Sequence, residues 1–172
     1  MNTTINLTGC RLHITNTDKF KSTLVSMKFK NDLTRETATL RSLLSMVLLG
    51  GTRQLPSIKS LAIHLEDLYG ANITSNVSTK GQAQIIHLSS TFVNENYLVS
   101  SEALFEQQLN LMKDILFDPN FENGIFSQNI VEAKKRELKE RLTALKDDKY
   151  TYALDQTLDA MGKNQVLGIS GI

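Results

Sequence analysis

The side chains best suited to chemistry in this chain are three histidines and one cysteine, and their spacing matches no catalytic motif. His13, His64 and His87 include no pair at the i,i+4 spacing, so the zinc-peptidase motifs HExxH and HxxEH are absent. His64 and Glu66 have the H-x-E spacing of zinc deaminases, but that site also needs two cysteines and Cys10 is the only one. We expect His64 on a polar or boundary face of a helix, and His87 facing solvent or contacting a neighbouring strand.

Two charged clusters also invite a chemical interpretation. The basic run 134–136 is interleaved with Glu132, Glu137 and Glu140, the pattern of a solvated helix with ion pairs one turn apart. The acidic pair at 147–148 could attract a cation, but it better suits a turn or a helix end. On its residues alone, the chain therefore has no catalytic or metal site, and we expect no cofactor.

Composition excludes further classes of function. The 172 residues carry 19 Lys and Arg against 18 Asp and Glu, a balance that argues against a nucleic-acid partner. No apolar run approaches the roughly 20 residues needed to cross a bilayer, so we expect no membrane partner. A single cysteine allows no intrachain disulfide and suits a reducing compartment, so the predicted location is cytoplasmic.

Hydrophobic periodicity predicts the elements that would position a site. Alternating side chains predict strands at 10–16 and 23–29, with a turn at 31–32 closing this pair, and a hairpin of 72–78 with 82–92. Apolar residues at three- and four-residue steps predict helices over 34–49, 56–70, 101–117, 127–146 and 150–161. This order favours an α+β fold, an antiparallel sheet with helices packed on one face.

One stretch resembles a known family. The segment LRSLLSMVLLGGT (40–52) is followed by Pro56, a second helix and LYGA (68–71). It resembles the first domain of the pitrilysin and mitochondrial-processing-peptidase family, the inverzincins, whose HxxEH helix ends in a Gly-Thr turn. Together with DDKYTYA (147–153), it looks most like a non-catalytic bacterial branch, the elongation factor P modification-associated peptidase-like proteins.

The resemblance implies that the family's zinc site has been lost. Aligning the Gly-Thr turn places the family's first metal histidine on Ser42, its catalytic glutamate on Ser45 and its second histidine on Met46. The third ligand, a glutamate on a later helix, falls near Arg141, with Glu137 and Glu140 as neighbouring alternatives. Hydroxyls and a thioether suit zinc poorly, and no residue is left as a base for a metal-bound water.

The resemblance also implies a partner and a longer protein. We expect a non-catalytic subunit that forms a heterodimer with an active, HxxEH-bearing homologue and helps bind a peptide or protein substrate. The family fold has two homologous halves, and residues 167–172 stop without a capping element, so we expect residues 1–172 to form a single peptidase-like domain, the N-terminal part of such a two-half protein. Two alternatives stay open: an active metallopeptidase with a displaced site or one completed in trans, and a plain protein-interaction domain.

In the family, the substrate lies as an added strand along the edge strand that follows the second helix. That strand would begin here with Asn72, Ile73, Thr74 and Ser75. No Pro or Lys occurs in it before Lys80, so its backbone lacks the usual protection of an edge. We therefore expect weak peptide binding by strand addition, with coverage of this edge by the missing half or by a partner as the alternative.

Overall fold

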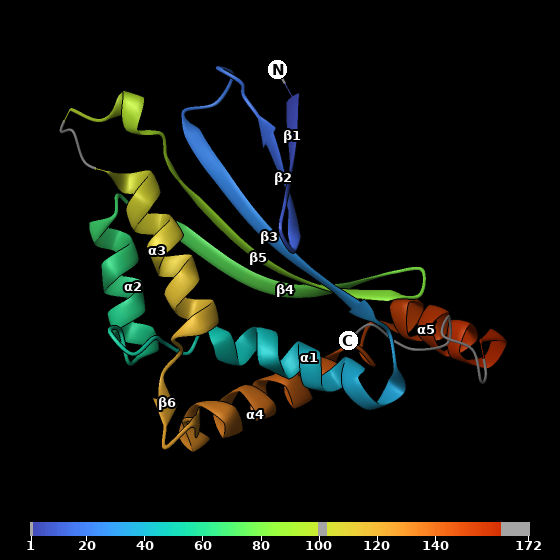
Figure 1. Ribbon diagram of the computed structural model, residues 1–172. Coiled ribbons are helices and arrows are strands. Elements are labelled where there is room, and N and C mark those ends of the chain that lie inside the picture. The colour runs from blue at the N-terminus through green and yellow to red at the C-terminus, as the bar shows by residue number, and fades with distance from the viewer. Residues whose placement is uncertain (1, 100–102, 163–172) are drawn as a thin grey trace.

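The computed structural model describes residues 2–99 and 103–162, which form an α+β fold (Figure 1). In chain order the elements are β1 (Asn2–Leu7), β2 (Cys10–Thr15), β3 (Ser22–Asp32), α1 (Arg35–Leu48), α2 (Ile58–Asp67), β4 (Asn72–Lys80), β5 (Ala83–Val93), a 3-10 turn (Glu95–Tyr97), α3 (Leu104–Phe117), β6 (Phe121–Glu122), β7 (Ile125–Phe126), α4 (Gln128–Ala144) and α5 (Lys149–Met161).

The main sheet has three antiparallel strands in the order β3-β5-β4. Leu88 of β5 lies between Met27 of β3 and Ser75 of β4, and this row faces the core. Because side chains alternate along a strand, the next row, which contains His87, lies on the opposite face of the sheet. The sheet is therefore apolar toward the helices and polar on its other side.

Helices α1 and α3 pack on the core side of the sheet, and α4 packs against α1 (Figure 1). The main core cluster draws on α1, α2, β4, β5 and α3. Its buried members are Leu48, Leu61, Ile73, Leu88, Leu111, Met112 and Ile115. This arrangement confirms the predicted fold class, an antiparallel sheet with helices packed on one face.

All five predicted helices are present within about three residues of the expected ends. Ser57 caps α2 through a reciprocal pair of hydrogen bonds with Ser60, and Gly51, with φ of 138°, follows α1. Asp148 caps α5 by accepting hydrogen bonds from the N–H and hydroxyl of Thr151, so the acidic pair marks a helix end as expected. Residues 101–102 and 163–172, including the chain end on which the two-half expectation rested, lie outside the described residues.

The predicted pairing of the first two strands is wrong. Strand β2 pairs with β1, which the sequence pattern did not predict, and β3 pairs with β5. The turn between β1 and β2 is Thr8-Gly9, and Gly9 has φ of 86°, a left-handed conformation that glycine adopts without steric cost. Residues 31–32 end β3 rather than closing a hairpin. The hairpin of β4 with β5 is confirmed.

Candidate functional site

Helix α1 carries Ser42, Ser45 and Met46, the three residues that the resemblance assigns to the family's metal and catalytic positions. Ser42 and Ser45 are 7% and 3% exposed, and Met46 is half-buried. The Ser42 hydroxyl donates to the carbonyl of Ala38 at 3.2 Å, and the Ser45 hydroxyl donates to the carbonyl of Ser42 at 2.8 Å. Both hydroxyls are thus bonded to the backbone of their own helix, a common arrangement for a serine within a helix.

A buried glutamine near the two serines forms further hydrogen bonds with α1. The Gln84 side chain is fully buried and donates from Nε2 to the carbonyl of Ala38 at 3.0 Å. Arg41 donates to Gln84 Oε1 at 3.2 Å and to the carbonyl of Asp32 at 2.6 Å. These bonds tie α1 to β3 and β5 and hold the serine-bearing face of α1 against the sheet.

Helix α4 brings the expected third-ligand region beside α1. Gly50, just after α1, lies so close to α4 that a Cβ there would be 2.6 Å from Cγ2 of Ile130. The two helices run antiparallel to each other (Figure 1). Because each rises about 1.5 Å per residue, residues 137–141 lie roughly level with residues 39–43. Measured along the axis of α1, the residues that the resemblance assigned to the third ligand therefore lie at about the same level as Ser42.

Several charged groups of this region of α4 form ion pairs with one another. Glu137 accepts hydrogen bonds from Lys134 at 2.8 Å and from Arg141 at 2.6 Å. The hydrogen bond from Lys134 is the main cause that holds the pKa of Glu137 below its ordinary value, with the charges of both cations adding to it. Lys135 pairs with Glu132 at 3.6 Å. The ion pairs predicted for a solvated helix are confirmed, and Arg141 is exposed.

These residues do not fit a zinc ion. Two serine hydroxyls that donate to backbone carbonyls and one thioether provide neither the imidazole nor the carboxylate ligands that zinc prefers. Of the two carboxylates at this level of α4, Glu137 has a lysine and an arginine bound to it, and Glu140 is exposed. Across residues 2–99 and 103–162, no group of three or more His, Cys, Asp or Glu is arranged to hold a metal. No step of catalysis can be derived for this region.

The three histidines lie apart from this region of α1. His64 is half-buried in the last turn of α2, as expected for a boundary position. His87 contacts the neighbouring strand, with its Nε2 at 2.7 Å from the Ser78 hydroxyl. Burial, and then the charge of Lys28 on β3, hold the pKa of His87 below its ordinary value. His13 lies on β2, with Nδ1 at 3.0 Å from the Thr4 hydroxyl.

Strand β4 is an edge of the main sheet, as the peptide-binding hypothesis requires. It pairs only with β5 in the described part of the chain. Asn72 and Thr74 are exposed, whereas Ile73 is buried and Ser75 is half-buried toward the core. Among the described residues, the Ser75 hydroxyl has no hydrogen-bond partner. The outer edge of this strand can therefore offer its backbone groups to an added strand.

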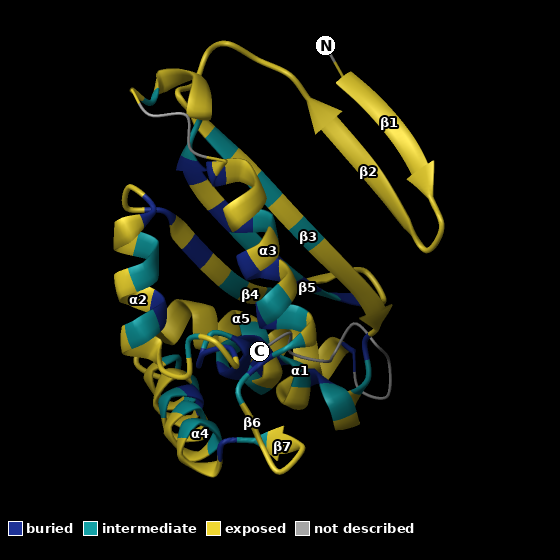
Figure 2. Cartoon of the chain, turned by 60° about the vertical axis from the view of Figure 1, so that its left-hand side comes forward, coloured by how far each residue is buried: buried dark blue, intermediate teal, exposed yellow. Residues whose placement is uncertain are grey.

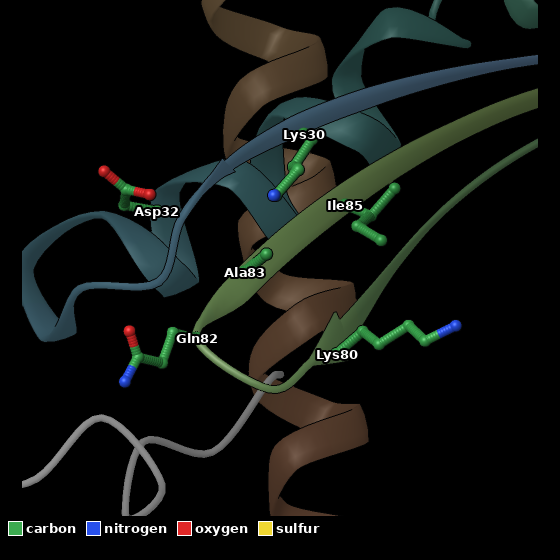
Figure 3. A pocket seen from close by; sticks show the side chains of 6 residues that line it. All are labelled: Lys30, Asp32, Lys80, Gln82, Ala83 and Ile85. Atoms are coloured by element: carbon green, nitrogen blue, oxygen red, sulfur yellow. The ribbon is translucent and has the colours of Figure 1, made fainter.

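An open hollow lies at the turn end of the same sheet (Figure 3). It is lined by Lys30, Asp32, Lys80, Gln82, Ala83 and Ile85. None of the predicted site residues lines it, and it contains no histidine or cysteine. Its one carboxylate, Asp32, belongs to no group of three metal-ligating side chains among the described residues, so the hollow adds no assembled set of metal ligands to the candidate site.

Comparisons with known proteins identify related chains. No family profile matches this chain. Over 156 residues, 91% of the chain, it is 35% identical to a protein of Bacillus subtilis (strain 168) described as probable inactive metalloprotease YmfF. The crystal structure of a conserved protein from Enterococcus faecalis V583 matches 99% of the chain with a TM-score of 0.88 and 27% identity. The chain spans 37% of the first protein and 41% of the second.

The similarity to YmfF supports a metallopeptidase-like family for this chain, and it agrees with the expectation that the chain is not an active enzyme. The TM-score shows that the fold described here occurs in a solved protein. In the described residues, no helix has both the length and the apolar character needed to span a membrane.

Neither the short β6-β7 hairpin nor the β1-β2 hairpin that carries Cys10 was predicted from the sequence. The signal for the β1-β2 hairpin was present, since apolar residues alternate on both sides of Thr8-Gly9.

Proposed function

We propose that this chain belongs to a non-catalytic, zinc-peptidase-like subunit of the inverzincin type, which pairs with an active HxxEH-bearing homologue and helps bind peptide or protein substrate. The proposal rests on the burial and hydrogen bonding of two serines on α1. Ser42 and Ser45, which the resemblance assigns to the family's metal and catalytic positions, are buried and are hydrogen-bonded to their own helix. The similarity to a protein named an inactive metalloprotease supports the same conclusion.

The proposal extends to the whole protein. The domain described here would form one part of a longer chain with two homologous halves, in line with the greater length of both related proteins. An active partner would supply the HxxEH motif, and this chain would supply binding surface. Purification of the complete protein from its native cells tests this part, because an HxxEH-bearing homologue should co-purify in a one-to-one complex. A complete protein that purifies alone under mild conditions would contradict the pairing.

The proposed peptide site is the outer edge of β4. The strand is nine residues long, which is enough for several main-chain hydrogen bonds to an added strand. The opposite edge of the sheet, β3, carries Lys28 and Lys30, and charged side chains of this kind protect an edge from further pairing. Strand β4 has no charged residue before Lys80, at its end. Of the two edges, β4 is thus the better acceptor for a peptide.

Binding of a labelled peptide by fluorescence polarisation tests the site without altering the protein. The probe is an unstructured Ser/Thr/Val peptide of about eight residues, prepared also with N-methyl groups on its odd or on its even positions. In strand addition only alternate peptide N–H groups pair with the edge, so one methylated series should bind at least about tenfold more weakly and the other nearly unchanged. Equal effects of both series, or none from either, would contradict strand addition.

Proline substitutions on β4 provide the matching test on the protein side. Thr74→Pro should abolish binding if its N–H points outward, and otherwise Ile73→Pro or Ser75→Pro should do so, because alternate residues pair outward. Thr74 is exposed, so its replacement also spares the core. Each variant is first checked by circular dichroism for an intact fold. Unchanged binding in all three folded variants would refute the β4 site.

A further inference from the structure

The β1-β2 hairpin has one apolar face and one polar face. Residues that pair across an antiparallel ladder point to the same side, and Ile5 pairs with Leu12 while Leu7 pairs with Cys10. The apolar face contains Ile5, Leu7, Cys10, Leu12 and Ile14, and the polar face contains Thr4, Asn6, Arg11 and His13. The apolar face of such an amphipathic hairpin is expected to pack against another part of a protein.

Nothing in the described part of the chain buries the apolar face. Every residue of β1 and β2 is exposed, and the four large aliphatic side chains are 40–51% exposed (Figure 2). The strands form a separate two-stranded sheet, outside the β3-β5-β4 ladder. A two-stranded hairpin on its own is at best marginally stable in water, so a covering layer is needed to hold it in place.

The size of the face indicates what kind of partner covers it. The exposed parts of these side chains amount to a few hundred Å², well below the roughly 800 Å² that each partner of a stable complex buries. A contact of this size is too small to hold two separate molecules together, including two copies of this chain. It is sufficient within one polypeptide, where association loses no translational freedom and the effective concentration is high.

We propose that the apolar face of the β1-β2 hairpin is an internal docking surface for the part of the complete polypeptide that lies outside these 172 residues. The two related proteins are long enough to provide this cover, since the matched region is 37% of one and 41% of the other. The match to the solved structure includes 99% of this chain, and therefore the hairpin region as well. This inference goes beyond the proposed function and does not depend on pairing with another subunit or on peptide binding.

Cys10 supplies a built-in probe of the proposal. It is the only cysteine of the chain, it is exposed, and it lies on the apolar face opposite Leu7. The experiment compares the rate at which maleimide modifies Cys10 in the 172-residue chain and in the complete protein, with mass spectrometry of the Cys10 peptide as the readout. We expect modification in the complete protein to be at least about tenfold slower, because a docked layer must open before the thiol can react.

The matched control moves the thiol to the polar face of the same hairpin. In the double variant Cys10→Ser, Asn6→Cys, the new thiol lies opposite Arg11 and should react at similar rates in the short and complete proteins. Equal rates for Cys10 in both proteins would overturn the proposal. So would protection that disappears on dilution of the complete protein, because it would show that a second molecule covers the face. Protection of both faces alike would also overturn it, since the apolar face would then have no special role.

Discussion

Replacing Gly50 by alanine tests the contact between α1 and α4 on which the placement of the candidate site depends. The added Cβ would lie 2.6 Å from Cγ2 of Ile130 and 2.9 Å from the carbonyl oxygen of Val47, whereas ordinary van der Waals contacts begin near 3.4 Å. Overpacking of this kind costs about 1–3 kcal/mol. Gly50 does not require a positive φ, so the alanine also restricts the unfolded chain and recovers about 0.4–1 kcal/mol. We expect Gly50→Ala to lower the free energy of unfolding by about 1–2 kcal/mol.

A double-mutant cycle, measured by urea denaturation, attributes this loss to Ile130. Ile130→Ala removes the methyl group that the new Cβ would meet, so Gly50→Ala should be about 1 kcal/mol less damaging in that background. Ile130→Val is the matched control, because valine keeps the methyl group at Cγ2 and loses only Cδ1, which is 3.1 Å from the new Cβ. It should restore little stability. Additive effects of Gly50→Ala and Ile130→Ala would refute the close approach of α4 to α1, and with it the placement of residues 137–141 at the level of Ser42 along α1.

Three further predictions concern the site and the elements around it. The purified chain should contain far less than one zinc per molecule by elemental analysis, and stoichiometric zinc would refute the loss of the metal site. The variant Ser45→Glu alone should not hydrolyse casein, because a general base without a metal has no bound water to activate. Turnover of casein by this variant would refute that reasoning. The pKa of His87 is depressed in the folded chain, so the stability that this provides is present above the ordinary value of 6.5 and is lost as the pH falls below it. Between about pH 5 and 7, the free energy of unfolding should depend less on pH in His87→Gln than in the unaltered chain, and Lys28→Gln should show a smaller reduction of the same kind. An unchanged pH profile in His87→Gln would contradict the assignment of this pH dependence to His87. Ser57→Ala should destabilise the chain by about 1 kcal/mol through loss of the α2 cap, and Ser57→Asp should retain most of that stability; equal losses in the two variants would argue against the cap.

The chemistry of the candidate site could be inferred largely from the sequence. The absence of HxxEH, and the presence of Ser42, Ser45 and Met46 within the matching segment, require only residue identities and spacing. Sequence could not show that both serine hydroxyls are bonded to backbone carbonyls, since that depends on side-chain rotation within a packed helix. Nor could it decide between Arg141, Glu137 and Glu140 for the third position, because nothing local fixes how α4 is aligned with α1.

For the β4 edge too, the sequence showed the residue types, and the tertiary structure showed where they lie. Its residue types and its lack of charge were visible in the sequence, but its status as an edge depends on the strand order β3-β5-β4. The comparison between the uncharged β4 edge and the lysine-bearing β3 edge depends on the pairing of β3 with the other side of β5, which only the tertiary structure shows. The peptide-binding hypothesis therefore gained a structural basis that the sequence pattern alone did not provide.

The sequence by itself determined the helices, the β4-β5 hairpin and the α+β class, whereas the tertiary structure decided which other strands pair and which helix faces meet. Helical hydrogen bonds join residues four apart, so the periodicity within a segment such as 35–48 is sufficient to predict it. The pairing of β3 with β5 joins Ser22 to Val93, residues far apart in the chain, and no local pattern specifies that partner. The β1-β2 hairpin is local, but its exposed apolar face satisfies no contact within the described residues, so its role depends on packing beyond them.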